Sequence, residues 1–232
     1  MPDSKSDSQW IILKADDLIY DSVHTLPAGF NKFIEYISRK QIKASLGIIG
    51  RSLETDVTAY FDALQEIHSS GLFEIWNHGY QHLLRGRKVR GEMFDEFQNT
   101  SSEYQYDNML KTQQLAKTKL GITLRTFGAP GNAIDDNTVK AIEQIDEIKV
   151  WLFGKPSGKL VLYRYCDIEY PTLKPDYSKF VEHYTTQRDY LVLQVHPKEW
   201  SKEDFMEFEK IIDFLLTKDV AFITPYDFYL RR

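Results

Sequence analysis

The sequence predicts an α/β fold, a barrel of seven or eight β/α units within one domain. Short apolar runs alternate with longer amphipathic segments between residues 10 and 224, and strands separated by helices of this length pair in parallel. The chain has 232 residues, which suits one barrel, since single barrels commonly take about 200–250 residues. Polar side chains follow several of the apolar runs, where barrels of this kind carry their function.

The expected strands are apolar runs of about five residues, and the expected helices place apolar residues on one face. Between 56 and 68, for example, Ala59, Ala63, Leu64 and Ile67 share a face at helical spacing. The strands are expected at 10–15, 44–49, 72–76, 123–127, 149–153, 160–165, 190–195 and 220–224. The helices are expected at 30–39, 56–68, 104–120, 136–145, 177–186 and 203–216, and a basic irregular segment at 85–90.

Composition limits the classes of protein that the chain can belong to. Residues 1–9 are polar and rich in Ser, Asp and Lys, and we expect a frayed tail, or the remnant of a removed export signal, before a single domain at 10–232. The net charge of −5 gives no electrostatic reason to expect nucleic acid. No apolar run approaches the roughly 18 residues of a membrane span. Cys166 is the single cysteine, which excludes an internal disulfide. No pattern in the sequence indicates the localisation or the oligomeric state of the protein.

The stretch around two histidines is the most informative part of the chain. After an apolar run at 72–76 the sequence reads Asn-His-Gly-Tyr-Gln-His, with His78 and His82 four residues apart. Gly79 directly behind the first histidine favours a strand end and a turn over a helix. The residue after His78 is not the Glu that the helical zinc-protease motif requires. The pair therefore predicts either a different metal site or two polar residues of a surface loop.

Other residues of the same chemical types also follow predicted strands. Asp16 and Asp17 follow the first strand, Pro130 and Gly131 the fourth, and His196 the penultimate one. In a parallel barrel these strand ends meet at one mouth. By contrast, His68 and His183 lie on predicted helices, and we expect them to be structural or solvated, like His24 in its loop.

Together these segments resemble the ordered motifs of the polysaccharide deacetylase family. The segments are Lys-Ala-Asp-Asp, Asn-His-Gly-Tyr-Gln-His, Phe-Gly-Ala-Pro-Gly and Leu-Gln-Val-His-Pro, in that order between residues 10 and 224. The resemblance implies the NodB-homology fold, a distorted β/α barrel. It also implies deacetylation of an acetylated carbohydrate.

The resemblance further implies a role for each matching residue. A divalent metal would be bound by Asp17, His78 and His82, with Asp16 as the general base and His196 as the general acid. The N–H of Gly131, after Pro130, would hold the oxyanion. One carboxylate and two imidazoles leave coordination positions open for water and substrate, as catalytic metal sites require. Zinc is expected, and cobalt, nickel or iron also suit these ligands.

Several positions depart from the family's pattern. Gly128 stands where an Arg usually orients the base, Gly131 where an aromatic residue usually follows the proline, and Gln194 where a leucine usually precedes the late histidine. The usual Asp and Trp motif after the fifth strand is also missing. Unless Arg125 or Arg164 takes the place of the missing Arg, Asp16 has no partner. Two alternatives therefore remain, a non-catalytic carbohydrate-binding protein and a hydrolase of a non-sugar amide.

Aromatic and basic residues give weaker indications of the substrate. Tyr163, Tyr165 and other tyrosines of the later loops suit stacking on sugar rings, although alternate residues of 160–165 are equally expected to face the core. Basic side chains at 85–90 suit an anionic glycan or a solvated loop. Trp76 is expected beneath the site and Trp200 on the wall of an acyl pocket.

Overall fold

The computed structural model describes residues 8–84, 87–89 and 92–232. Most strands are short, and the helices lie between them in the chain. The strands are β1 (Gln9–Leu18), β2 (Ala44–Ile48), β3 (Phe73–Asn77), β4 (Arg87–Val89), β5 (Glu92–Phe94), β6 (Thr126–Phe127), β7 (Val150–Leu152), β8 (Leu160–Leu162), β9 (Tyr190–Val195) and β10 (Val220–Phe222). The helices are α1 (Ala28–Lys40), α2 (Thr58–Ser69), α3 (Ser102–Leu120), α4 (Asp136–Glu143), α5 (Tyr177–His183), α6 (Lys202–Leu216) and α7 (Pro225–Leu230), with 3-10 turns η1 (Gly50–Glu54), η2 (Pro130–Asn132) and η3 (Pro197–Glu199).

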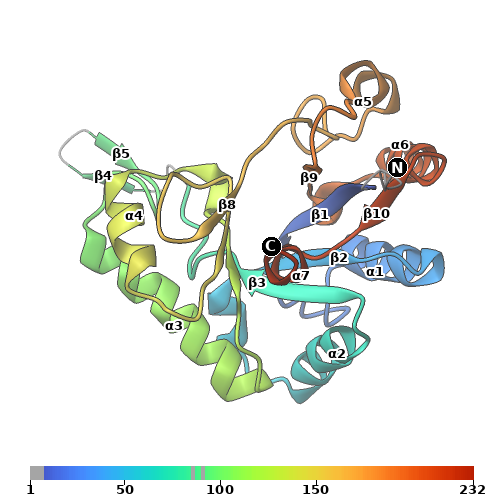
Figure 1. Ribbon diagram of the computed structural model, residues 1–232. Coiled ribbons are helices and arrows are strands. Elements are labelled where there is room, and N and C mark those ends of the chain that lie inside the picture. Colours follow the sequence, from blue (N-terminus) through green and yellow to red (C-terminus); the bar gives the residue numbers. More distant parts are fainter. Residues whose placement is uncertain (1–7, 85–86, 90–91) are drawn as a thin grey trace.

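The main sheet is parallel and curls into an incomplete barrel. Its order is β10-β1-β2-β3-β6-β7-β8, and β9 pairs with β1. β1 pairs with three strands, because β10 joins its first residues, β2 its later ones, and β9 runs along residues 10–15. Helices α1, α2, α3 and α6 lie around the outside of the sheet (Figure 1). The predicted distorted β/α barrel of seven or eight units is confirmed. Among the described strands, β8 and β9 are not paired with each other, so the barrel is open between them.

The core forms because the strands are apolar on both faces and the helices on one. Every residue of β2 and β9 is buried, as expected for parallel strands covered on both sides. α1 and α6 each turn an apolar face inward, at the spacing of a helix packed on a sheet. These faces are Phe30, Phe33, Tyr36 and Ile37 on α1, and Phe205, Phe208, Ile211, Ile212 and Leu215 on α6.

Some predicted boundaries were wrong. β1 extends to Leu18, so Asp16 and Asp17 lie in its last part and not after it. β6 has only two residues, and β8 ends at Leu162 before exposed side chains begin. Part of the expected irregular basic segment forms the antiparallel hairpin of β4 and β5, while Arg85 and Arg90 lie outside the described residues. Helix α7 was not predicted, although Thr224 as N-cap before Pro225 is a helix-start signal.

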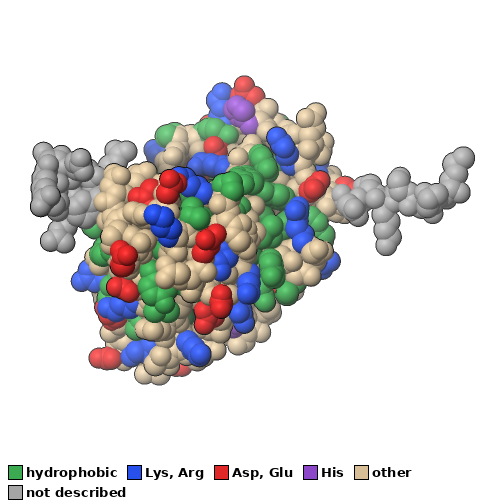
Figure 2. Space-filling model, turned by 60° about the vertical axis from the view of Figure 1, so that its left-hand side comes forward, with side chains coloured by type: hydrophobic (Ala, Val, Ile, Leu, Met, Phe, Trp, Pro, Cys, Tyr) green, Lys and Arg blue, Asp and Glu red, His purple; other side chains and the backbone are tan. Residues whose placement is uncertain are grey.

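The surface carries charges of both signs. On the face drawn in Figure 2, acidic and basic side chains of the described residues are interspersed. No helix within the described part of the chain is long and apolar enough to cross a membrane.

Candidate active site

The end of β1 places two adjacent carboxylates at one mouth. In a regular strand, neighbouring side chains point to opposite faces of the sheet. Here the pairing of β1 with β2 shifts register between Ala15 and Leu18, and Asp17 has a φ of +70°. Such an irregularity bends a strand and re-aims its side chains. Asp16 and Asp17 therefore both line the same cavity.

The loop after β3 carries the two histidines. It turns sharply, with φ of +73° at Gly79 and +54° at His82, and a Cβ on Gly79 would lie 2.8 Å from the Phe97 ring, so glycine fits here best. Asn77, at the end of β3, accepts a hydrogen bond from the Gly79 N–H at 3.0 Å. The buried Glu96 carboxylate accepts from the backbone N–H groups of Tyr80, Gln81 and Leu83 at 2.6 to 3.4 Å.

The predicted metal ligands come together. The ligand atoms of Asp17, His78 and His82 lie within 4.8 Å of one another, and Asp17 Oδ1 is 3.2 Å from His78 Nε2 and 2.7 Å from His82 Nε2. His78 Nδ1 is 2.7 Å from the Gly128 carbonyl oxygen, to which it can only donate, which leaves the Nε2 lone pair for a cation.

The charges of this cluster also suit a cation. Burial by itself would raise the pKa of Asp17, but its contacts with the His78 and His82 imidazoles outweigh that effect and hold the pKa well below its usual value. Asp17 is therefore ionised. Two imidazoles and an ionised carboxylate that converge on one point fit a single divalent metal ion.

Asp16 is held by two partners that we did not predict. Lys14 is fully buried, and its Nζ lies 2.7 and 2.5 Å from the two Asp16 carboxylate oxygens. Gln194 donates from its amide nitrogen to Asp16 Oδ2 at 2.8 Å. Burial lowers the pKa of Lys14, and the nearby Asp16 opposes that effect. Asp16, the predicted base, thus has a lysine partner although Gly128 stands where the resemblance implies an Arg.

The space at Gly128 explains why this replacement is compatible with Lys14. A Cβ on Gly128 would lie 2.9 Å from the Trp76 ring and 3.3 Å from Lys14 Cε. Neither arginine considered from the sequence takes part, since Arg125 packs over the Tyr226 ring and Arg164 pairs with Asp167. Lys14 was nevertheless detectable, because it is a lysine in an otherwise apolar predicted strand, two residues before Asp16 and so on the same side.

His196 is held by Glu169, which no sequence pattern revealed. Glu169 accepts from His196 Nδ1 at 2.7 Å, from the His196 backbone N–H at 2.8 Å and from Trp200 Nε1 at 2.9 Å. Burial alone would lower the pKa of His196, but the hydrogen bond to Glu169 and the nearby charges raise it. His196 Nε2 lies 3.9 Å from Asp16 Oδ2, so predicted acid and base meet in the structure.

The mouth is a cavity of about 440 Å³, which Gly131, Asn132 and Leu173 also line. Pro130 is buried beneath it in η2. Trp76 is buried and meets the His78 ring edge-on with centroids 5.0 Å apart, which confirms its expected position. Trp200 does not line the cavity, contrary to expectation, because its indole lies behind Glu169 and packs against Phe33 and Phe208.

Fold and site together define an open parallel β/α barrel with a candidate single-metal site at the C-terminal ends of its strands. The model of the polysaccharide deacetylase family matches residues 5–147, more than half of the chain. The chain belongs to the polysaccharide deacetylase family. A comparison with curated proteins finds no match.

Solved structures of carbohydrate esterases share the fold at low sequence identity. The Xyl-CE4 domain of a multidomain xylanase from the hindgut metagenome of Trinervitermes trinervoides has a TM-score of 0.65 at 15% identity, over 97% of this chain and 91% of that one. A family 4 acetyl xylan esterase from Clostridium thermocellum, in complex with a cobalt ion, has a TM-score of 0.66 at 15% identity, over 96% and 91%. A CE4 family pseudoenzyme from Bacillus anthracis has a TM-score of 0.63 at 14% identity, over 94% and 64%.

Proposed function

We propose that this protein is a metal-dependent hydrolase that removes an acetyl group from an N- or O-acetylated carbohydrate. Membership of the polysaccharide deacetylase family supports the class of reaction. The observation that carries the proposal is the convergence of Asp17, His78 and His82 within 4.8 Å, in the same cavity as Asp16 and His196. That cavity therefore offers a metal site, a base and an acid together.

Asp17, His78 and His82 would hold the ion, for which zinc is our first choice and cobalt, nickel and iron are alternatives. A divalent ion there supplies Lewis acidity, which polarises an acyl carbonyl and lowers the pKa of water. Every other part of the reaction is assigned to side chains and backbone groups of the chain itself.

Asp16 is the general base. Its carboxylate lies 3.8 Å from His78 Nε2, beside the ligand cluster, and accepts the proton of the attacking water. Lys14 and Gln194 fix its orientation from two sides. A base held in one geometry before the substrate arrives needs little reorganisation during the reaction.

His196 is the general acid. Its raised pKa favours the protonated ring, and Nε2 donates to the departing amine or alcohol as the bond to the acyl carbon breaks. The N–H of Gly131 donates to the oxygen of the acyl group as that oxygen gains negative charge. The products are acetate and the deacetylated sugar.

The non-catalytic alternative loses part of its support. It rested on Gly128 in place of an Arg that orients the base, and Lys14 supplies a cation to Asp16 instead. The B. anthracis relative in the same fold is a pseudoenzyme, so turnover is the decisive property. Hydrolysis of a non-sugar amide would use the same residues and differ only in the substrate.

The proposal is tested by metal analysis together with acetate release. We expect wild type to hold about one equivalent of zinc and His78→Ala to lose it, while His68→Ala, a change at an exposed histidine on α2, keeps it. Acetate should be released from chitooligosaccharides or acetylated xylan by wild type but not by Asp16→Asn or His196→Ala, both metal-loaded. Full metal occupancy without acetate release from either glycan would refute the proposal of a carbohydrate deacetylase. Hydrolysis of a cyclic amide in a parallel panel would then identify the protein as an amidase.

A further inference from the structure

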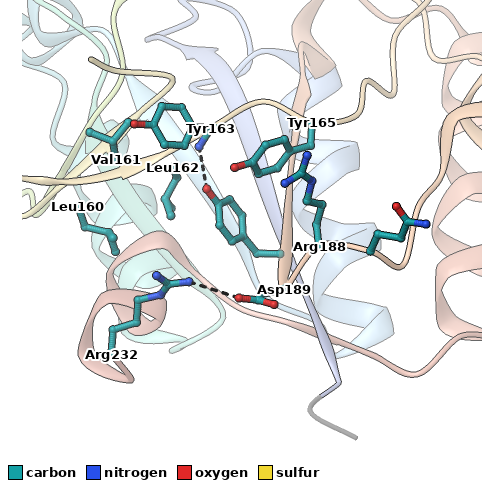
Figure 3. A pocket seen from close by; sticks show the side chains of 10 residues that line it. Leu160, Val161, Leu162, Tyr163, Tyr165, Arg188, Asp189 and Arg232 are labelled. Carbon is teal, nitrogen blue, oxygen red and sulfur yellow. Dashed lines mark hydrogen bonds and ion pairs between the residues drawn. The ribbon is translucent and has the colours of Figure 1, made fainter. Parts of the chain in front are cut away.

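A second cavity lies beside the mouth, where the barrel is open. The sheet ends at β8 on one side, and β9 pairs with β1 on the other. Between them is a cavity of about 320 Å³, here called the side hollow. Its walls include Tyr190 and five residues that Figure 3 labels, Tyr163, Tyr165, Arg188, Asp189 and Arg232. A volume near 300 Å³ lies at the lower end of the range for small-ligand sites.

The side hollow presents aromatic rings with hydroxyl groups. Tyr163 and Tyr165 are 41% and 38% exposed, so they do not face the core, and their ring centroids are 6.5 Å apart. The Tyr190 ring centroid is 5.6 Å from that of Tyr165, and the Tyr190 phenol oxygen accepts from the Tyr163 backbone N–H at 3.0 Å. Burial raises the pKa of Tyr190 to about 12, so the phenol keeps a proton to donate.

Charged groups with planar geometry border these rings. The Arg188 guanidinium lies 4.4 Å from the centroid of the Tyr165 ring, a cation–π contact that places its N–H donors beside this ring. Arg232 pairs with Asp189 at 3.9 Å (Figure 3). The side hollow therefore combines apolar ring faces with N–H donors and one carboxylate acceptor. Sugar rings, which have apolar C–H faces and a rim of hydroxyls, match this combination.

The side hollow and the mouth share a wall. Arg164 lines the mouth, whereas its neighbours Tyr163 and Tyr165 line the side hollow. A polymer bound at one opening would be kept at high local concentration near the other.

We propose that the side hollow is a second, non-catalytic binding site for the sugar units of a glycan chain. The choice of glycan as ligand rests on the proposed function, and the site itself rests on the side hollow's own residues. Binding at the side hollow would require neither the metal ion nor catalysis.

Calorimetric titration of the full chain with chitohexaose and with xylohexaose tests this inference. The His78→Ala background separates it from binding at the metal. There we expect Tyr163→Ala/Tyr165→Ala and Arg188→Ala each to weaken binding of at least one glycan at least tenfold. The matched control is Arg39→Ala, since Arg39 packs over the Tyr36 ring at 5.4 Å on α1, and it should bind as the background does.

The outcomes separate this inference from the proposed function. Equal affinity in the side-hollow variants and the background, or no binding of either glycan by the background, would overturn the second site even if acetate is released. A tenfold loss confined to the side-hollow variants would support the second site even if wild type releases no acetate. Thermal unfolding of each variant shows that a loss of binding is not a loss of fold.

Discussion

At the scale of single residues, the environment of Asp16 decides whether the site can be catalytic. A carboxylate that is 1% exposed needs a compensating partner, because an unpaired buried charge is strongly disfavoured. Lys14 provides this charge from within the same strand, and the space it occupies is open because residue 128 has no side chain. Lys14 within β1 thus leaves Asp16 paired although residue 128 is a glycine.

We predict that Lys14→Met lowers kcat about tenfold to a hundredfold without loss of metal. Methionine fills the space between the Trp76 and Phe153 rings, which lie 5.0 and 5.3 Å from Lys14 Nζ, but it cannot hold Asp16. General-base catalysis contributes about 10²- to 10⁴-fold, and the change removes only the orientation of the base. Steady-state kinetics with metal analysis measures the effect.

The control for this change is Lys43→Met, which breaks an ion pair with Asp227 at the surface and should leave kcat unchanged. An unchanged kcat in Lys14→Met would contradict the assigned role.

Glu169 should set the pH range in which His196 acts. Glutamine at 169 keeps the size of the side chain but removes the charge that raises the pKa of His196. The acid must be protonated to work, so a lower pKa ends activity at a lower pH. We predict that Glu169→Gln moves the alkaline limb of the kcat/KM profile down by about one pH unit. Glu203→Gln, at an exposed position of α6, should not move it, and an unmoved limb in Glu169→Gln would exclude this role.

At the scale of elements, two strand ends are shaped by irregular backbone that side chains hold in place. The register shift in β1 aims Asp16 and Asp17 at the mouth, and the loop after β3 depends on Asn77 and Glu96. Residues with positive φ store strain, and the surrounding hydrogen bonds offset it. The positions of the predicted metal ligands therefore depend on the irregular end of β1 and on the loop after β3, and not on the sheet alone.

We predict that Glu96→Gln weakens zinc binding about tenfold, although Glu96 contacts no ligand atom of the site. Glutamine has one acceptor oxygen, and its NH₂ group would face backbone N–H donors that now share a carboxylate. Residues that orient metal ligands typically contribute 10- to 100-fold in affinity. Competition with a chromogenic chelator measures it, with the exposed Glu103→Gln as control. Unchanged affinity would show that the loop holds its shape without Glu96.

At the scale of the whole molecule, the sequence predicted the features that depend on short segments of the chain. Alternating apolar runs predicted the barrel, because strand order follows from short segments. The spacing of His78 and His82 after a strand predicted that the two side chains lie together, and their role as metal ligands stays a prediction. Glu169 was not predicted because its partner His196, which directly follows β9, lies 27 residues away in the sequence. Trp200 was wrongly predicted to line the cavity, because its indole N–H donates to Glu169 and its ring packs away from the cavity. Such contacts depend on packing that one segment cannot specify.

The stability of the whole barrel should depend on pH through Glu74. This residue of β3 is partly buried and accepts hydrogen bonds from Thr126 of β6 and from the Tyr226 backbone N–H at the start of α7, so it links three elements. Burial raises its pKa to about 7, whereas an unfolded glutamate titrates near pH 4.3. The folded state therefore binds the proton more tightly, and the stability this group contributes is complete below about pH 4 and is lost as the pH rises through 7.

We predict that Glu74→Gln, which mimics the protonated side chain, raises the free energy of unfolding relative to wild type by about 1 kcal/mol at pH 5 and by about 3 kcal/mol at pH 8. Denaturant unfolding at both values measures the difference. Glu66→Gln, at an exposed position of α2, serves as control and should give the same difference from wild type at both. Glu74→Gln is expected to be the more stable protein at pH 8 because wild type must then either bury the Glu74 charge between β3, β6 and α7 or let these elements separate. A difference between Glu74→Gln and wild type that did not grow with pH would mean that the Glu74 carboxylate is solvated in the folded protein.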